Sequence, residues 1–147
     1  MDSLHRLLAI EDIKNLKARY LRLLDCKLWE EWGEVFTADA QFRYGEGPHD
    51  VVHGRNNIVR FARHVLGDAV TVHHGHMPEI EVMNPANAAG IWTMHDVLLY
   101  PEGHSRASSE GYGHYKETYR QEADGEWRIA TVLMTRLLVH AGSTARK

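Results

Sequence analysis

The chain has 147 residues, of which 44% are hydrophobic and 25% are charged, and its formal net charge is -3. This composition is typical of a globular protein, and the length suits one domain with a substantial core. The mild negative charge argues against nucleic acid or an anionic membrane surface as a partner.

No apolar run is long enough to cross a bilayer, and the first residues, MDSLHR, lack the apolar core of a signal peptide. We therefore expect a cytoplasmic protein. The single cysteine, Cys26, excludes an internal disulfide. We expect it to be an unreactive small hydrophobic residue.

Residues 3–27 have the pattern of an amphipathic helix. Apolar side chains recur at helical spacing from Ile13 to Leu24, and Lys17 is expected to lie away from that stripe.

A shorter helix is expected over 28–36 and a first strand over 40–44. The loop GEGPHD at 45–50 follows, and a third helix ends at about Leu66.

The second half is expected to form four long strands, at 69–83, 87–100, 109–121 and 126–140. The turn sequences NPAN, PEGHSRAS and ADGE separate them. Long consecutive strands form an antiparallel meander. The chain is therefore expected to be α+β, with about three helices packed on one face of a curved, mostly antiparallel sheet.

Three of the eleven histidines, His73, His74 and His76, fall within four residues of one expected strand. Side chains alternate between the two faces of a strand, so the three cannot converge on one metal ion without distortion. The chain has no HExxH or CxxC pattern either. We expect no metal and no cofactor.

The residues alone leave open whether His73 or His74 faces the core. The valines before His74 share its face, which would turn His74 inward. If His73 faces inward instead, Ile80 and Val82 are out of phase with it, and a β-bulge near Pro78 would reconcile them.

Two charged residues fall on apolar strand faces. Asp96 shares a face with Trp92 and Met94, and Arg136 shares one with Met134. A carboxylate on such a face is costly unless it is paired, so a histidine or Arg136 is its expected partner. A purely structural ion pair would give the same pattern.

Tyr20 lies on the apolar stripe of the first helix and could be an ordinary core tyrosine. Asp25 is five residues further on, about 140° around an ideal helix. Both can face one cavity only if the helix bends or ends near Leu24. Asp25 could instead cap the helix expected over 28–36.

The motifs AIEDIKNLKARY, VFTADA, HGR, VHHGHMPEIEV, GYGHY and GEWRIA together resemble the SnoaL-like branch of the nuclear transport factor 2-like superfamily. The resemblance covers about residues 5–140. It implies one domain over 1–147 that forms a cone-shaped α+β barrel, with a bent sheet around a pocket and a flexible tail at 141–147. The family includes dehydratases, isomerases, cyclases, hydrolases and non-enzymatic binders, so the fold does not choose among them.

The site pattern resembles those of scytalone dehydratase and bile acid 7α-dehydratase, and it favours His73 as the inward histidine. The resemblance implies that His73 is a general base oriented by Asp96, and that Tyr20 donates to a developing oxyanion. Asp25 would position the leaving hydroxyl or a water, and Arg136 would bind a polar group of the substrate or hold Asp96.

An apolar cup suits an aromatic or polycyclic small molecule. The residues expected to bind it are Trp92, Met94, Met77, His114, Tyr115 and Trp29. We expect a cofactor-independent lyase, a dehydratase, that removes a proton next to a carbonyl or an activated aromatic centre. The alternatives are an isomerase or cyclase that returns the proton elsewhere, and a non-catalytic binding module.

The strand at 87–100 is apolar on its second face as well, at Ile91, Val97 and Leu99. Relatives in the family associate through this face of the sheet. The resemblance therefore implies a homo-oligomer, either a dimer or a trimer.

Overall fold

The computed structural model describes residues 1–142, so the tail expected at 141–147 lies almost wholly outside the described residues. Three helices and six strands follow in the order α1 (Ser3–Asp25), α2 (Trp29–Gly33), β1 (Phe36–Arg43), β2 (Val51–His53), α3 (Arg55–Leu66), β3 (Val70–Asn84), β4 (Asn87–Leu99), β5 (Ser109–Gln121) and β6 (Trp127–Ala141). Among these residues, no helix has the length and apolar character needed to cross a membrane.

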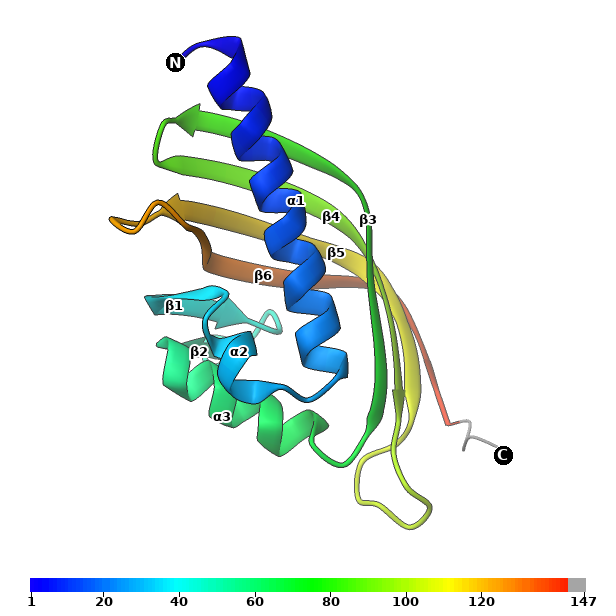
Figure 1. Ribbon diagram of the computed structural model, residues 1–147. Helices are drawn as coiled ribbons and strands as arrows, with labels where there is room; N and C mark the ends of the chain where they lie inside the picture. The colour runs from blue at the N-terminus through cyan, green and yellow to red at the C-terminus, as the bar shows by residue number, and fades with distance from the viewer. Residues whose placement is uncertain (143–147) are drawn as a thin grey trace.

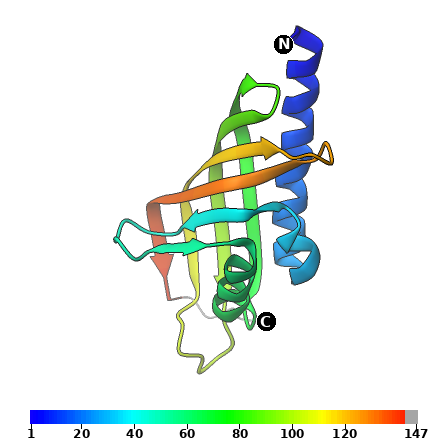
Figure 2. The same cartoon turned by 90° about the vertical axis from the view of Figure 1, so that its left-hand side faces the viewer.

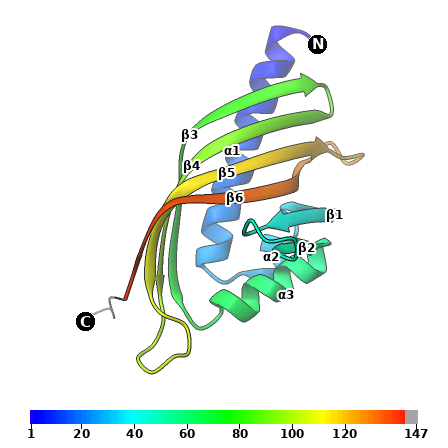
Figure 3. The same cartoon turned by 180° about the vertical axis from the view of Figure 1, so that it is seen from behind.

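The six strands form one sheet in the order β2-β1-β6-β5-β4-β3. Only the β1–β6 pair is parallel. Figure 1 shows the long strands β3 to β6 curling around α1, with α2 and α3 at one end of the curve. Figure 2 shows β1 and β2 beside α3, and Figure 3 shows the outer face of the sheet on the side away from the helices. The α+β prediction is confirmed.

Helix α1 begins where the Asp2 side chain accepts a hydrogen bond from the backbone N–H of His5. Its predicted stripe from Ile13 to Leu24 is buried. The prediction that Lys17 lies away from this stripe is wrong, because Lys17 is fully buried against Glu117 of β5.

The helix predicted over 28–36 is shorter than expected and ends at Gly33. The buried ring of Phe36 begins β1 instead, since Phe36 pairs with Ile129 of β6. Strand β1 therefore starts four residues before the predicted 40–44. The short strand β2 was not predicted, and it pairs with the end of β1.

The β-bulge expected near Pro78 is present. The register between β3 and β4 shifts between His76 and Glu79, and Met77 has a left-handed φ of 38°. Because of this shift, His73 before the bulge and Val82 after it are both buried on the inner face.

The first testable prediction concerns Gly113, where the register between β5 and β6 shifts. A Cβ there would overlap the carbonyl oxygen of Thr135 and lie 2.9 Å from Arg136 Cα. Both contacts are with backbone, so Gly113→Ala is expected to lower the free energy of unfolding by about 1–3 kcal/mol in urea titrations. Gly75→Ala is the matched control, because its Cβ would only make ordinary side-chain contacts. Equal stability of the two variants would contradict the prediction.

Candidate active site

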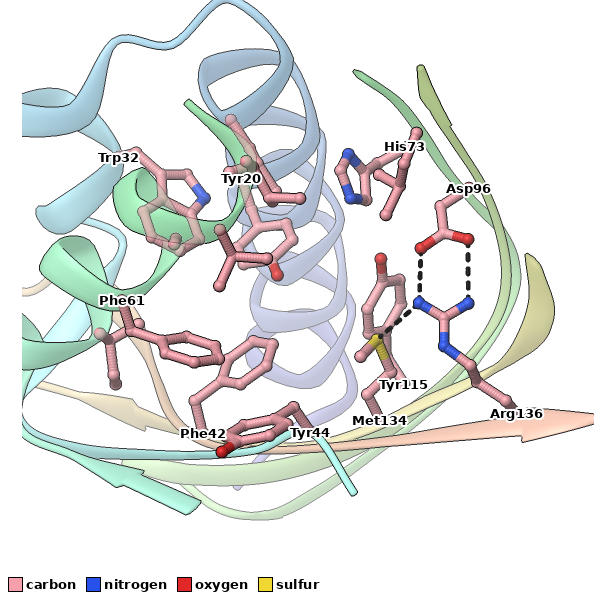
Figure 4. Close-up of a pocket in the computed structure, with 16 residues that line it drawn as sticks. Tyr20, Trp32, Phe42, Tyr44, Phe61, His73, Asp96, Tyr115, Met134 and Arg136 are labelled. Carbon is pink, nitrogen blue, oxygen red and sulfur yellow. Dashed lines mark hydrogen bonds and ion pairs between the residues drawn. The ribbon is translucent and has the colours of Figure 1, made fainter. Parts of the chain in front are cut away.

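A cavity of about 280 Å³ lies between the curved sheet, α1 and α3. Most of its wall is apolar and comes from the residues Leu24, Phe42, Ile58, Phe61, Val65 and Leu98. Seven of the lining residues carry a polar side-chain group: Tyr20, Trp32, Tyr44, His73, Asp96, Tyr115 and Arg136. Figure 4 shows His73, Asp96, Tyr115 and Arg136 on one side, opposite Phe42 and Phe61, with Tyr20 between the two groups.

His73 projects inward from β3 and is only 7% exposed. Its Nδ1 lies 2.7 Å from Oδ1 of Asp25, and its backbone N–H donates to Oδ2 of Asp25 at 2.8 Å. A carboxylate only accepts hydrogen bonds, so Nδ1 donates to Asp25, and in the neutral imidazole the lone pair lies on Nε2. Figure 4 shows the imidazole at the cavity wall. The choice of His73 over His74 as the inward histidine is confirmed.

The predicted partner of His73 was Asp96, and this pairing is wrong. Asp96 lies directly opposite His73 in the register of β3 and β4. Its carboxylate turns instead to Arg136, whose Nη1 and Nη2 donate to it at 3.0 and 2.8 Å. The hydrogen bonds that Arg136 donates to Asp96 outweigh the effect of burial and raise the pKa of Arg136.

Gly111 of β5 makes room for this ion pair. It stands opposite Asp96 in the register of β4 and β5. A Cβ at this position would overlap the guanidinium of Arg136 and contact the Asp96 carboxylate. The two-pronged geometry, in which each carboxylate oxygen accepts from its own nitrogen, therefore depends on a glycine on the neighbouring strand.

Tyr20 and Asp25 could serve one site only if the helix bent or ended near Leu24. Asp25 is the last residue of α1, so the helix does end there. Its Oδ1 also accepts a hydrogen bond from the hydroxyl of Thr71 at 3.0 Å, and Lys27 donates to that hydroxyl at 2.6 Å. Burial works against ionisation of Asp25. The hydrogen bonds from the ring and backbone of His73, and from Thr71, nevertheless lower its pKa.

The alternative role of Asp25, as a cap for the second helix, is wrong. Leu28 occupies that position and makes no side-chain capping bond. Asp25 itself does not line the cavity. It supports His73 from the side away from the cavity, which differs from the expected contact with the leaving group.

Tyr20 and Tyr115 place their phenol rings next to each other, with centroids 6.1 Å apart in an edge-on arrangement. Figure 4 shows both hydroxyls directed into the cavity. Burial raises the pKa of both phenols well above the usual range. Both groups therefore remain neutral hydrogen-bond donors.

Of the six residues expected to bind substrate, only Tyr115 lines the cavity. Trp92 and Met94 face inward as predicted, but they are buried in the core, where Trp92 donates to the hydroxyl of Tyr119. Met77 is exposed at the bulge. His114 lies between two buried neighbours on β5, so its side chain points to the outer face of the sheet.

The sixth, Trp29, packs edge-on against Trp32 in α2, and it is Trp32 that reaches the cavity. Other lining residues that the site prediction missed are Phe42 of β1, Tyr44 directly after β1, and Phe61 of α3. Which core residues border a cavity depends on how β1 and α3 pack against the sheet.

The other histidines of the cluster lie on the outer face. The ring of His74 is 5.7 Å from that of His76 and 5.9 Å from that of His95. His95 pairs with Glu110 at 2.8 Å. Within residues 1–142, no group of histidine, cysteine and acidic side chains is arranged to hold a metal ion.

Comparison with known proteins gives a family match over most of the chain. Residues 5–132 match the family described as SnoaL-like domain. A candidate scytalone dehydratase from Novosphingobium aromaticivorans is similar in structure, with a TM-score of 0.83, 19% identity and 99% of each chain covered.

Two further solved structures are similar. The hexachlorocyclohexane dehydrochlorinase LinA-type3 of Novosphingobium barchaimii has a TM-score of 0.82 and 18% identity, with 99% of each chain covered. A variant of a Mycobacterium tuberculosis protein of unknown function, Rv3472, has a TM-score of 0.75 and 24% identity, with 88% of this chain and 77% of that chain covered. At these identities the likeness establishes the shared fold.

The second prediction is a pH dependence of the Asp25 contacts. Because the folded pKa of Asp25 lies below its ordinary value of 3.8, its contribution to stability is fully present above about pH 4. That contribution is lost as the pH falls through the folded pKa. Asp25→Asn should therefore be less stable than wild type at neutral pH, and the difference in urea unfolding free energy should shrink in acid. A difference that is constant from neutral to strongly acidic pH would contradict this.

Proposed function

Because the chain belongs to the SnoaL-like domain family, we propose that it is a cofactor-independent lyase acting on a neutral, apolar small molecule. The observation that carries the proposal is the His73–Asp25 dyad at the wall of a largely apolar cavity. The dehydratase and dehydrochlorinase assignments of the similar structures agree with a reaction that eliminates a small group.

The free Nε2 of His73 is the general base. It takes a proton from the carbon next to a carbonyl or an activated aromatic centre, and the C–H electron pair moves toward that centre. This electron pair then forms a C=C bond while the bond to the leaving hydroxyl breaks. The hydroxyl takes the proton back from His73 and leaves as water. Asp25 holds the imidazole in the tautomer that this sequence requires.

The two phenols are the donors for the negative charge that develops in this reaction. Tyr20 and Tyr115 both reach the cavity as neutral hydroxyls. Preorganised donors of this kind stabilise an oxyanion more in a water-poor site than in bulk water. Arg136 uses two nitrogens on Asp96 and keeps further N–H groups, which can bind an oxygen of the substrate or the leaving group.

The size and charge of the cavity support a bicyclic or similar aromatic compound. A volume of about 280 Å³ is large enough for such a ring system. The cation Arg136 is already neutralised by Asp96, so an anionic substrate would find no free positive charge among the lining residues. A neutral substrate fits better.

The third prediction tests the base. We expect turnover of a bicyclic β-hydroxy ketone such as 3-hydroxy-1-tetralone, whose dehydration gives fluorescent 1-naphthol. His73→Ala should lower kcat by about 10²–10⁴. Asp25→Asn should also lower kcat, because an asparagine side chain no longer holds the His73 imidazole in the tautomer with its proton on Nδ1. His74→Ala, on the outer face, is the matched control and should retain activity.

Solvent deuterium separates the related reactions. Incorporation of deuterium at the α-carbon without loss of water would favour an isomerase or cyclase that uses the same base. Binding of the ketone with neither exchange nor elimination would favour a non-catalytic module. Full activity of His73→Ala would refute the assignment of the base.

The fourth prediction is that the protein is a homo-oligomer. Large apolar side chains are exposed on or beside the outer face of the sheet, among them Val70, Val72, Ile91, Leu137 and Val139. Light scattering should give a dimer or trimer mass. Ile91→Lys should shift that mass toward the monomer, and a wild-type monomer would contradict the prediction.

A further inference from the structure

A buried ion pair lies outside the catalytic arrangement described above. Lys17 of α1 donates to Oε1 of Glu117 on β5, and both side chains are 0% exposed. The other carboxylate oxygen accepts from the hydroxyl of Tyr119 at 2.6 Å. Trp92 in turn donates to that hydroxyl at 2.8 Å. Burying two charges is expensive, and a buried pair is seldom a net gain in stability over apolar residues of similar size.

The ammonium of this pair lies against the two cavity tyrosines. Lys17 Nζ is 3.9 Å from the ring centroid of Tyr20 and 3.7 Å from that of Tyr115. Both distances are well within the range of a cation–π contact. Neither Lys17 nor Glu117 lines the cavity, so the pair reaches it only through these two rings.

The Lys17–Glu117 pair also has a definite orientation relative to the two cavity tyrosines. Gly111, Tyr115, Glu117 and Tyr119 follow one another along the inner face of β5, from the Asp96 end toward the core. Glu117 is bound on the side of Tyr119, while the ammonium contacts the rings whose hydroxyls enter the cavity. The positive end of the pair is therefore directed at the phenols.

Without this ammonium, the phenols would face an excess of negative charge. Burial and the neighbouring Tyr115 act most strongly to raise the pKa of the Tyr20 phenol, and the carboxylates Glu117, Asp25 and Asp96 act in the same direction. Arg136 is the other cation at the cavity, and it is bound to Asp96. An oxyanion next to these hydroxyls would be repelled by the carboxylates unless a second cation stood nearby.

We propose that the Lys17–Glu117 pair positions Tyr20 and Tyr115 and supplies the positive potential that lets their hydroxyls receive an oxyanion. Lys17 is a positioning residue, since it acts only through the two rings. This inference rests on the proposed function and narrows its substrate class. The substrate is a ketone or related carbonyl compound whose oxygen becomes an enolate when His73 removes the α-proton. A halogenated hydrocarbon without a carbonyl forms no enolate oxygen, so the Lys17–Glu117 pair would not assist its reaction.

The test compares binding of an oxyanion with binding of a neutral molecule of similar shape. The probes are 4-nitrophenol, whose absorbance reports its ionisation, and nitrobenzene, which lacks the hydroxyl. The variant Lys17→Met/Glu117→Gln removes both charges at once and leaves no unpaired buried ion. The matched control is Lys14→Met/Glu11→Gln, which removes an exposed pair of 2.6 Å from the same helix.

We expect wild type and the control to have the same ratio of phenolate to phenol affinity. In Lys17→Met/Glu117→Gln the ratio of phenolate to phenol affinity should fall roughly tenfold or more, while nitrobenzene affinity is unchanged. A role in packing alone would lower the affinity for all ligands together and leave the ratio unchanged. That result would overturn the proposal.

A second variant keeps the proposal testable if the first does not fold. Lys17→Gln/Glu117→Gln also removes both charges but leaves two amide side chains that can hydrogen-bond to each other, so the ratio of phenolate to phenol affinity should again fall. An unchanged ratio would overturn the inference. These are binding measurements without turnover, so they can fail while the His73 assay succeeds, and the His73 assay can fail while they succeed.

Discussion

The carboxylate of Asp25 joins the end of α1 to β3, and the candidate site depends on this contact. It accepts hydrogen bonds from the backbone N–H and the ring of His73 and from the Thr71 hydroxyl. Three donors on one carboxylate fix the helix end, the strand and the imidazole relative to one another. Each bond favours the ionised form of Asp25, which is the form that holds the imidazole in a basic tautomer.

Two further ion pairs lie at the inner face of the sheet, and in each of them a buried charge is neutralised by its partner. Asp96 is neutralised by Arg136, and the glycine at 111 leaves space for both. Lys17 is neutralised by Glu117 next to the cavity tyrosines. The cavity wall is consequently apolar with a few oriented polar groups, an arrangement that suits proton transfer on a neutral ring compound.

Much of the fold and part of the site could be predicted from local pattern. Alternation along β4 placed Asp96 on the inner face. Alternation along β3 left His73 and His74 open, and the family resemblance, combined with a bulge near Pro78, favoured His73. The prediction for Asp96 holds because strand periodicity is a local property. How far the cavity extends along that face is not a local property of one strand. Trp92 faces inward as predicted and yet packs in the core, away from the cavity.

By itself, the sequence determined that Asp96 and Arg136 stand on apolar faces of the strands and that a buried charge of this kind needs a partner. The tertiary structure alone decided the partners. Asp25 reaches His73 across 48 residues and Arg136 reaches Asp96 across 40. Lys17, predicted to lie outside the apolar stripe, meets Glu117 across 100 residues. Such contacts depend on where helices and strands end and cross, and spacing along one element carries no information about that.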